Sequence, residues 1–186
     1  MRKSAACVLA LLSLATRDAS ATLLTPIDFG ELVASSRAIL HGQVVDVRSR
    51  RSNDRLRAET LVTLQVATNL KGDLGKEVTF VVPGGTVGRY RTIVVGAPSF
   101  REGEEVVLFL GANGPTLPYL TRLGQGVFRV VSDPRSNERM IAPDPLTSKG
   151  DDWRRVVRGE AANEPTSLAT FATRVRALAG NAPVNR

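Results

Sequence analysis

Short apolar stretches separated by turn-forming residues dominate the middle of the chain. Residues 60–68 alternate well, with Val62, Leu64 and Val66 on one face and Thr63, Gln65 and Ala67 on the other. This pattern is typical of a half-buried antiparallel strand. β-Branched and aromatic residues bounded by glycine and proline predict further strands at residues 38–47, 77–82, 90–95 and 105–110. Residues 119–123 and 126–131 are expected to form a last strand or a pair of strands, and residues 139–142 are a candidate for a short edge strand.

Two segments at the ends of this β-rich region have helical spacing instead. Residues 28–36 begin with Asp28 as a helix cap, and Glu31 follows three residues later as in a capping box. Residues 167–178 place apolar side chains at i, i+3, i+7 and i+10, which makes one apolar stripe along a helix. Those side chains are Leu168, Phe171, Val175 and Leu178.

The spacing of the strands indicates the fold class. Five to seven short strands at intervals of roughly 8–12 residues, with no helix alternating between them, favour a small barrel or sandwich over a parallel sheet. We therefore expect a mainly β protein, an OB-like antiparallel barrel with a short N-terminal helix and a C-terminal amphipathic helix. The expected organisation is a signal peptide at 1–21, the barrel domain at 22–142, a polar linker at 143–166 and the C-terminal helix at 167–180.

The first residues have the features of a cleavable export signal. Arg2 and Lys3 precede an apolar run at residues 5–15, and small residues at Ala19 and Ala21 suit a cleavage site after Ala21. The run is shorter than the roughly 20 residues that span a membrane, and Cys7 stands too early to be a lipoprotein cysteine. We expect an exported protein, periplasmic or extracellular, with no membrane span after cleavage.

Charge and cysteine content narrow the chemistry of the exported part. The chain carries a formal net charge of +7, and its single cysteine lies inside the expected signal peptide. The mature protein would therefore have neither a disulfide nor a reactive thiol. Its basic character suits an anionic partner such as nucleic acid, an acidic glycan or lipopolysaccharide, but it favours the simpler interpretation, a soluble protein with a high isoelectric point.

Several short motifs occur in a fixed order between residues 29 and 131. They are G-x-V at 42–44, LKG at 70–72, PGG at 83–85, GAP-x-F at 96–100, GEE at 103–105, FL at 109–110 and a glycine-bearing strand at 124–128. In this the chain resembles a group of exported bacterial domains of unknown function. The resemblance implies export and a β-barrel fold, and it implies no activity, because the shared residues are turn-formers and core apolar residues.

Residues that would support catalysis or metal binding are scarce. His41 is the only histidine, and without a second histidine or a mature cysteine the chain lacks the usual zinc ligands. Glu104 and Glu105 are neighbours on an expected strand, so their side chains should point to opposite faces. Asp151 and Asp152 fit a helix start better than a catalytic pair. The glycines of PGGTVG and GQG lack the helix that a phosphate loop needs. We expect no cofactor, no metal site and no enzymatic activity.

A polar segment at residues 48–57, interpreted as an exposed turn, is the main candidate binding site. Its arginines are Arg48, Arg50, Arg51, Arg55 and Arg57, opposed only by Asp54. Guanidinium groups pair bidentately with phosphate or carboxylate, and loops at a barrel mouth bind ligands in OB-folds. The shortage of stacking aromatics disfavours nucleic acid.

Three functions are compatible with these features. The first is a non-catalytic, exported binding or protein-interaction domain whose partner is an unknown protein or an anionic envelope polymer. The second is a binder of anionic polymers or lipid headgroups through the arginine-rich segment. The third is a hydrolase that uses carboxylates which the sequence does not pair.

Overall fold

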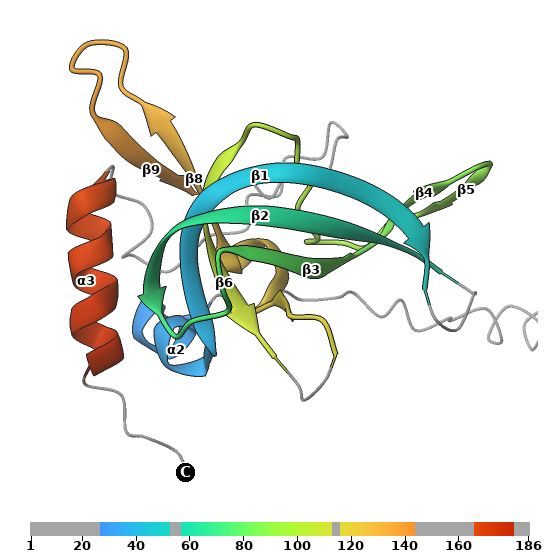
Figure 1. Ribbon diagram of the computed structural model, residues 1–186, viewed down its shortest axis with the longest axis horizontal. Helices are drawn as coiled ribbons and strands as arrows, with labels where there is room; N and C mark the ends of the chain where they lie inside the picture. Colours follow the sequence, from blue (N-terminus) through green and yellow to red (C-terminus); the bar gives the residue numbers. More distant parts are fainter. Residues whose placement is uncertain (1–26, 53–56, 113–115, 144–165, 181–186) are drawn as a thin grey trace, which may run out of the picture.

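A computed structural model describes residues 27–52, 57–112, 116–143 and 166–180, and these form a β-barrel flanked by two helices (Figure 1). The helices are α2 (Phe29–Ser35) and α3 (Leu168–Gly180), with a short 3-10 helix, η2 (Leu123–Gly126). The strands are β1 (Ala38–Arg51), β2 (Ala58–Lys71), β3 (Glu77–Pro83), β4 (Gly85–Val87), β5 (Tyr90–Thr92), β6 (Glu105–Gly111), β7 (Tyr119–Leu120), β8 (Val127–Ser132), β9 (Arg139–Pro143) and β10 (Thr166–Ser167).

The sheet closes on itself because β1 pairs with two strands. The main sheet runs β1-β2-β3-β7-β6-β8-β9-β10, and β1 also pairs with β6, so β1, β2, β3, β7 and β6 form a closed ring. The pairings are antiparallel except one, the parallel contact of Val81 with Tyr119 between β3 and β7. Strands β8 to β10 extend from β6 towards α3, and β4 pairs with β5 in a separate two-stranded sheet. The predicted fold class, a mainly β OB-like barrel with a helix near each end, is confirmed.

Gly42 lies where β1 is held between its two partner strands. The register with β2 shifts between His41 and Gly42, while the pairing of the same residues with β6 continues without a shift. A Cβ atom at Gly42 would lie 2.1 Å from the carbonyl oxygen of Gln65 on β2. This close approach of two backbones requires glycine, and the irregular register lets β1 curve around the barrel.

Several predicted boundaries differ from the structure. The first four residues of the segment 48–57, expected as a turn, belong to a strand, because β1 continues to Arg51; β2 begins at Ala58, and residues 53–56 lie outside the described part of the chain. The strand expected at 90–95 ends at Thr92 and pairs with β4 in the small sheet. The strand expected at 119–123 is only two residues long and leads into η2. In each case long-range pairing, which local propensity does not report, decides the boundary.

The apolar side chains form two clusters on opposite sides of the barrel wall. One fills the barrel and includes Phe80, Leu64 and Leu108. The other lies between the wall and the two helices, where the rings of Phe29, Phe109, Phe128 and Phe171 contact one another with centroids 4.9–6.4 Å apart. The C-terminal helix therefore shares its core with the barrel.

Lys71 ties the end of β2 to the end of α2. Its Nζ donates hydrogen bonds to the carbonyl oxygens of Val33 (2.7 Å) and Ala34 (3.1 Å), in the last turn of the helix. Carbonyls in that turn have no partner within the helix, so the lysine satisfies them. Burial lowers the pKa of the Lys71 ammonium from its ordinary value. Gly72 follows with a positive φ of 62° and passes close to the carbonyl of Arg37.

We expect Lys71→Met to lower the free energy of unfolding by about 1 kcal/mol, because two charge-assisted hydrogen bonds are lost while the apolar stem is kept. Urea denaturation of the purified variant measures this. Lys76→Met is the matched control, since Lys76 is exposed on the neighbouring turn. Equal losses in the two variants would contradict the capping role of Lys71.

Candidate functional site

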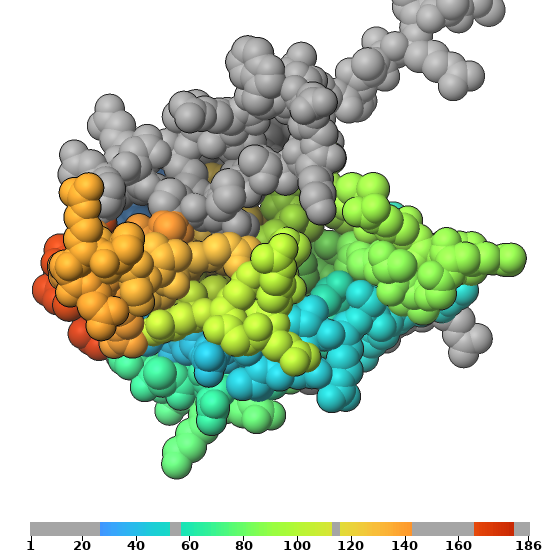
Figure 2. All heavy atoms as spheres, turned by 90° about the horizontal axis from the view of Figure 1, so that it is seen from above, coloured from blue at the N-terminus to red at the C-terminus, as the bar shows by residue number. Residues whose placement is uncertain are grey.

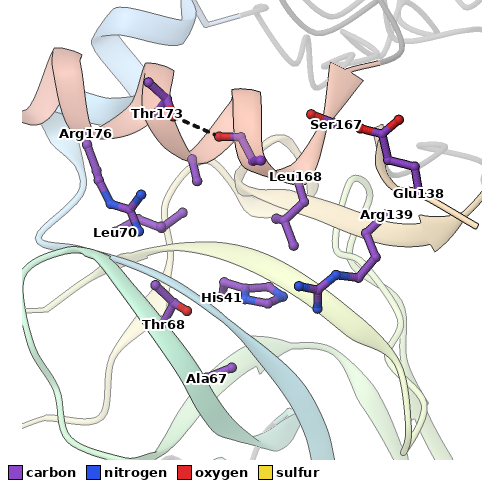
Figure 3. Close-up of a pocket in the computed structure, with 12 residues that line it drawn as sticks. His41, Ala67, Thr68, Leu70, Glu138, Arg139, Ser167, Leu168, Thr173 and Arg176 are labelled. Atoms are coloured by element: carbon purple, nitrogen blue, oxygen red, sulfur yellow. Dashed lines mark hydrogen bonds between the residues drawn. The ribbon is translucent and has the colours of Figure 1, made fainter.

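A cleft of about 550 Å³ lies between α3 and the outer wall of the barrel (Figure 3). Its charged and titratable lining comes from three elements and their flanks: His41 from β1, Glu138 and Arg139 at the start of β9, and Arg176 from α3. Leu70 and Leu168 contribute apolar surface. This volume is within the range of sites that hold small ligands.

Two residues of a three-residue polar network, His41 and Arg139, line the cleft. His41 Nε2 lies 2.7 Å from Glu105 Oε1, and the same carboxylate oxygen accepts a hydrogen bond of 2.8 Å from Arg139 Nη1. His41 is only 6% exposed, whereas the Arg139 side chain is 57% exposed. The buried His41 thus helps to fix the Glu105 carboxylate, which in turn holds the exposed side chain of Arg139. Arg139 is therefore oriented before any ligand binds.

The imidazole of His41 has an acidic partner but no hydroxyl partner. Within the described residues, no serine or threonine hydroxyl is hydrogen-bonded to its ring. A serine-type nucleophile needs such a bond to a base. The network is therefore suited to holding and orienting Arg139, and its geometry does not assemble a catalytic triad in the described part of the chain.

The arginines predicted as one binding group divide between the two faces of β1. Arg48 pairs with Asp46 and Arg50 with Glu59, each at 2.8 Å, on one face of the β1–β2 hairpin. Arg51 is on the opposite face, with its guanidinium carbon 4.9 Å from the centre of the Tyr90 ring. Arg57 is exposed just before β2, and Arg55 lies outside the described residues.

The β4–β5 hairpin brings Arg89 to the ring of Tyr90, which Arg51 also contacts, and Arg91 follows Tyr90 on β5. We name Arg51, Arg89, Tyr90 and Arg91 the arm surface, because this hairpin projects from the barrel beside the end of β1 (Figures 1 and 2). The guanidinium carbon of Arg89 lies 5.3 Å from the centre of the Tyr90 ring. Arg89, Tyr90 and Arg91 are all exposed.

Polar contacts fix the hairpin to the β1–β2 hairpin. The amide of Ala58 donates to Thr92 Oγ1 at 2.9 Å, and Thr60 Oγ1 donates to the carbonyl of Gly84 at 2.8 Å. Gly85 has φ +149°, and a Cβ there would lie 2.7 Å from Thr60 Oγ1 and 2.8 Å from Ser49 Oγ. The glycines of PGG thus form the close turn between β3 and β4 that the sequence predicts. The sequence did not place Tyr90 beside Arg51, because no local pattern reports that contact.

The adjacent carboxylates of Glu104 and Glu105 have separate basic partners. Glu104 pairs with Arg129, and Glu105 bonds to His41 and Arg139. Each carboxylate is thereby committed to a cation rather than to the other acid, which is not the arrangement of a glycosidase pair. Asp151 and Asp152 lie outside the described residues.

Neither the described residues nor the comparisons with known proteins identify a metal site, a membrane-spanning helix or a protein family. In the described ranges no group of three or more potential ligands could hold a metal ion, and none of the helices there has the length and apolar character to cross a membrane. No family model, curated protein or solved structure matches this chain. The resemblance based on short motifs stays a prediction, and function has to be inferred from the geometry.

Proposed function

We propose that this protein is a non-catalytic, exported binding domain that holds an anionic envelope polymer with its arm surface. The observation that supports the proposal is the contact of two guanidinium groups, from Arg51 and Arg89, with the exposed ring of Tyr90. Tyr90 is 53% exposed, so the group is open to a partner.

Electrostatics favour an anionic partner at this position. Arg51, Arg89 and Arg91 lie on or beside one small hairpin, whose residues 84–92 include no acidic residue. Like charges held together repel one another, and a polymer of phosphates or carboxylates relieves that repulsion. Arginine makes bidentate bonds to both groups. The aromatic ring also holds the guanidinium planes in place through cation–π contact.

The arginines on the other face of β1 are poorer candidates. Arg48 and Arg50 already pair with Asp46 and Glu59. A polyanion would have to compete with those carboxylates, so the net gain from these arginines is smaller. The proposed site therefore centres on the β4–β5 hairpin, and Arg51 is included because its guanidinium group contacts Tyr90.

We expect the double variant Arg89→Ser/Arg91→Ser to bind polyphosphate and polyglutamate at least tenfold more weakly than the original protein at low salt. When binding releases counterions, the logarithm of the affinity falls linearly with the logarithm of the salt concentration. Removal of two arginine contacts should reduce the steepness of that line by about 2. Fluorescence polarisation with labelled polymers, at several salt concentrations, measures both quantities.

The matched control is Arg48→Ser/Arg50→Ser, which removes the same charge from the opposite face. Its affinity should change much less, because the lost arginines were already neutralised. Equal losses in the two double variants would show a general charge effect and would contradict a site on the arm surface. Preference for one polymer distinguishes phosphate from carboxylate recognition.

A protein partner is the second candidate, favoured by apolar side chains next to the hairpin. Ile93 is 74% exposed and Val95 is 64% exposed. Such residues are costly to leave in water and are common at protein interfaces. Co-purification from the native envelope fraction separates the two candidates, since an apolar interface survives high salt while polyanion binding does not.

A further inference from the structure

The cleft beneath α3 combines two guanidinium groups with an apolar wall, far from the arm surface. Figure 1 places α3 and the β4–β5 hairpin at opposite ends of the long axis. We propose that this cleft binds a small organic carboxylate with an aliphatic body. The arginines would hold the carboxylate, and the apolar wall would cover the body.

Arg139 and Arg176 enter the cleft from different sides. Figure 3 shows Arg176 reaching down from α3 and Arg139 reaching in from β9, both towards the strands that carry His41 and Thr68. Only Nη1 of Arg139 is bonded to Glu105, so its other N–H groups are available for a ligand. Arg176 is exposed, and in the described part of the chain no carboxylate lies within ion-pair distance of it.

The charge of the lining favours an acid over a base. Arg139 and Arg176 are opposed in the lining by one carboxylate, that of Glu138. Glu138 lies at the Ser167 end of the cleft, away from Arg176 (Figure 3). Beside the lining, Glu105 bonds to His41 and to Arg139 and offsets part of the Arg139 charge. A carboxylate over His41 and Thr68 would therefore be held mainly by Arg176, with further bonds from the N–H groups of Arg139 that Glu105 leaves unbonded. Charge-assisted bonds of this kind are about twice as strong as neutral ones.

The remaining wall is apolar and sets the character of the ligand body. Leu70 comes from β2, and Leu168, Ala169 and Ala172 come from α3. Aliphatic ligand groups placed there would leave water, which is favourable at roughly 25 cal/mol per Å². A purely inorganic anion would make no use of this surface. An aliphatic acid and a short peptide with a free C-terminus both match it.

The binding test uses two carboxylate probes and their uncharged analogues. The probes are octanoate and N-acetyl-leucyl-leucine, compared with octanol and with the amide of the same peptide. His41 is the only histidine, so its ring signals in NMR spectra report on this cleft alone. We expect saturable shifts of those signals with at least one acid, and at least tenfold weaker binding of its uncharged analogue.

Two variants locate the binding within the cleft. Arg176→Gln should weaken binding of the acid about tenfold to a hundredfold, because a charged hydrogen-bond partner is lost. Ala169→Phe should abolish binding by filling the cleft from an exposed position on α3. The matched control is Arg174→Gln on the same helix, since Arg174 lies 5.0 Å from the Phe29 ring and does not line the cleft.

Each result of the binding test has a different meaning for the ligand of the cleft. Binding of octanoate alone assigns the site to free aliphatic acids, and binding of the peptide alone assigns it to peptide C-termini. The proposal is overturned if neither acid shifts the His41 signals at millimolar concentration, or if acid and uncharged analogue bind equally. An equal effect of Arg174→Gln and Arg176→Gln would also overturn it. None of these results depends on the polyanion experiment at the arm surface.

Discussion

Replacement of Phe171 by alanine is expected to lower the free energy of unfolding by about 3–5 kcal/mol, the cost typical of truncating a buried phenylalanine. Phe171 is 5% exposed, and its ring contacts those of Phe29, Phe109 and Phe128. These rings come from α2, β6 and β8, so the variant loses contacts that join the C-terminal helix to three other elements. Chemical denaturation monitored by circular dichroism measures the effect.

Tyr90→Ala is the matched control for this prediction, because it also removes one aromatic ring. Tyr90 is 53% exposed on the β4–β5 hairpin, so its removal leaves no cavity and should cost less than about 1 kcal/mol. If Phe171→Ala were as mild as Tyr90→Ala, α3 would not be part of the barrel core. The cleft beneath α3 would then lose the rigid wall on which the carboxylate proposal depends.

Gly42→Ala is expected to destabilise the protein by about 3 kcal/mol or more, near the upper end of overpacking costs. The new methyl group would lie 2.1 Å from the carbonyl oxygen of Gln65, and a backbone atom cannot move aside as a side-chain tip can. Relief of the clash requires β1 and β2 to separate where β1 also pairs with β6. Loss of soluble expression or a large fall in melting temperature is the measured result.

Gly180→Ala is the control for Gly42→Ala, since a Cβ at Gly180 would meet nothing within 4 Å. Its stability should stay within about 0.5 kcal/mol of the original protein, the range of ordinary surface changes. Similar losses at both glycines would mean that the Gly42 contact is not a close approach of two strands. The irregular register of β1 would then need a different explanation.

The two stability predictions bear on the candidate sites in different ways. His41 is next to Gly42, so the packing of β1 at this point also positions the imidazole that orients Glu105 and Arg139. Phe171 holds α3, which carries Arg176. The carboxylate site therefore depends on two packing contacts that lie outside it, and its variants should be compared only after their folding has been verified.

Residue spacing along the chain was enough to predict several of the local elements of this protein. Alternation through Val62, Leu64 and Val66 predicted β2, and the apolar stripe through Phe171 and Val175 predicted α3. The cap at Asp28 is confirmed by hydrogen bonds of 2.7 and 3.2 Å from the amides of Gly30 and Glu31. These features follow from periodicity and short-range hydrogen bonding, which a linear sequence reports directly.

The meeting of distant segments became visible only in the folded protein. The arginine-rich segment looked like one basic group, but strand pairing turns Arg48 and Arg50 towards carboxylates and Arg51 towards Tyr90. The cleft joins β1, β2, β9 and α3, which are far apart in the chain, and nothing local to His41 or Arg176 indicates their proximity. Register and helix docking arise from long-range packing, so the candidate sites could not be read from residue spacing.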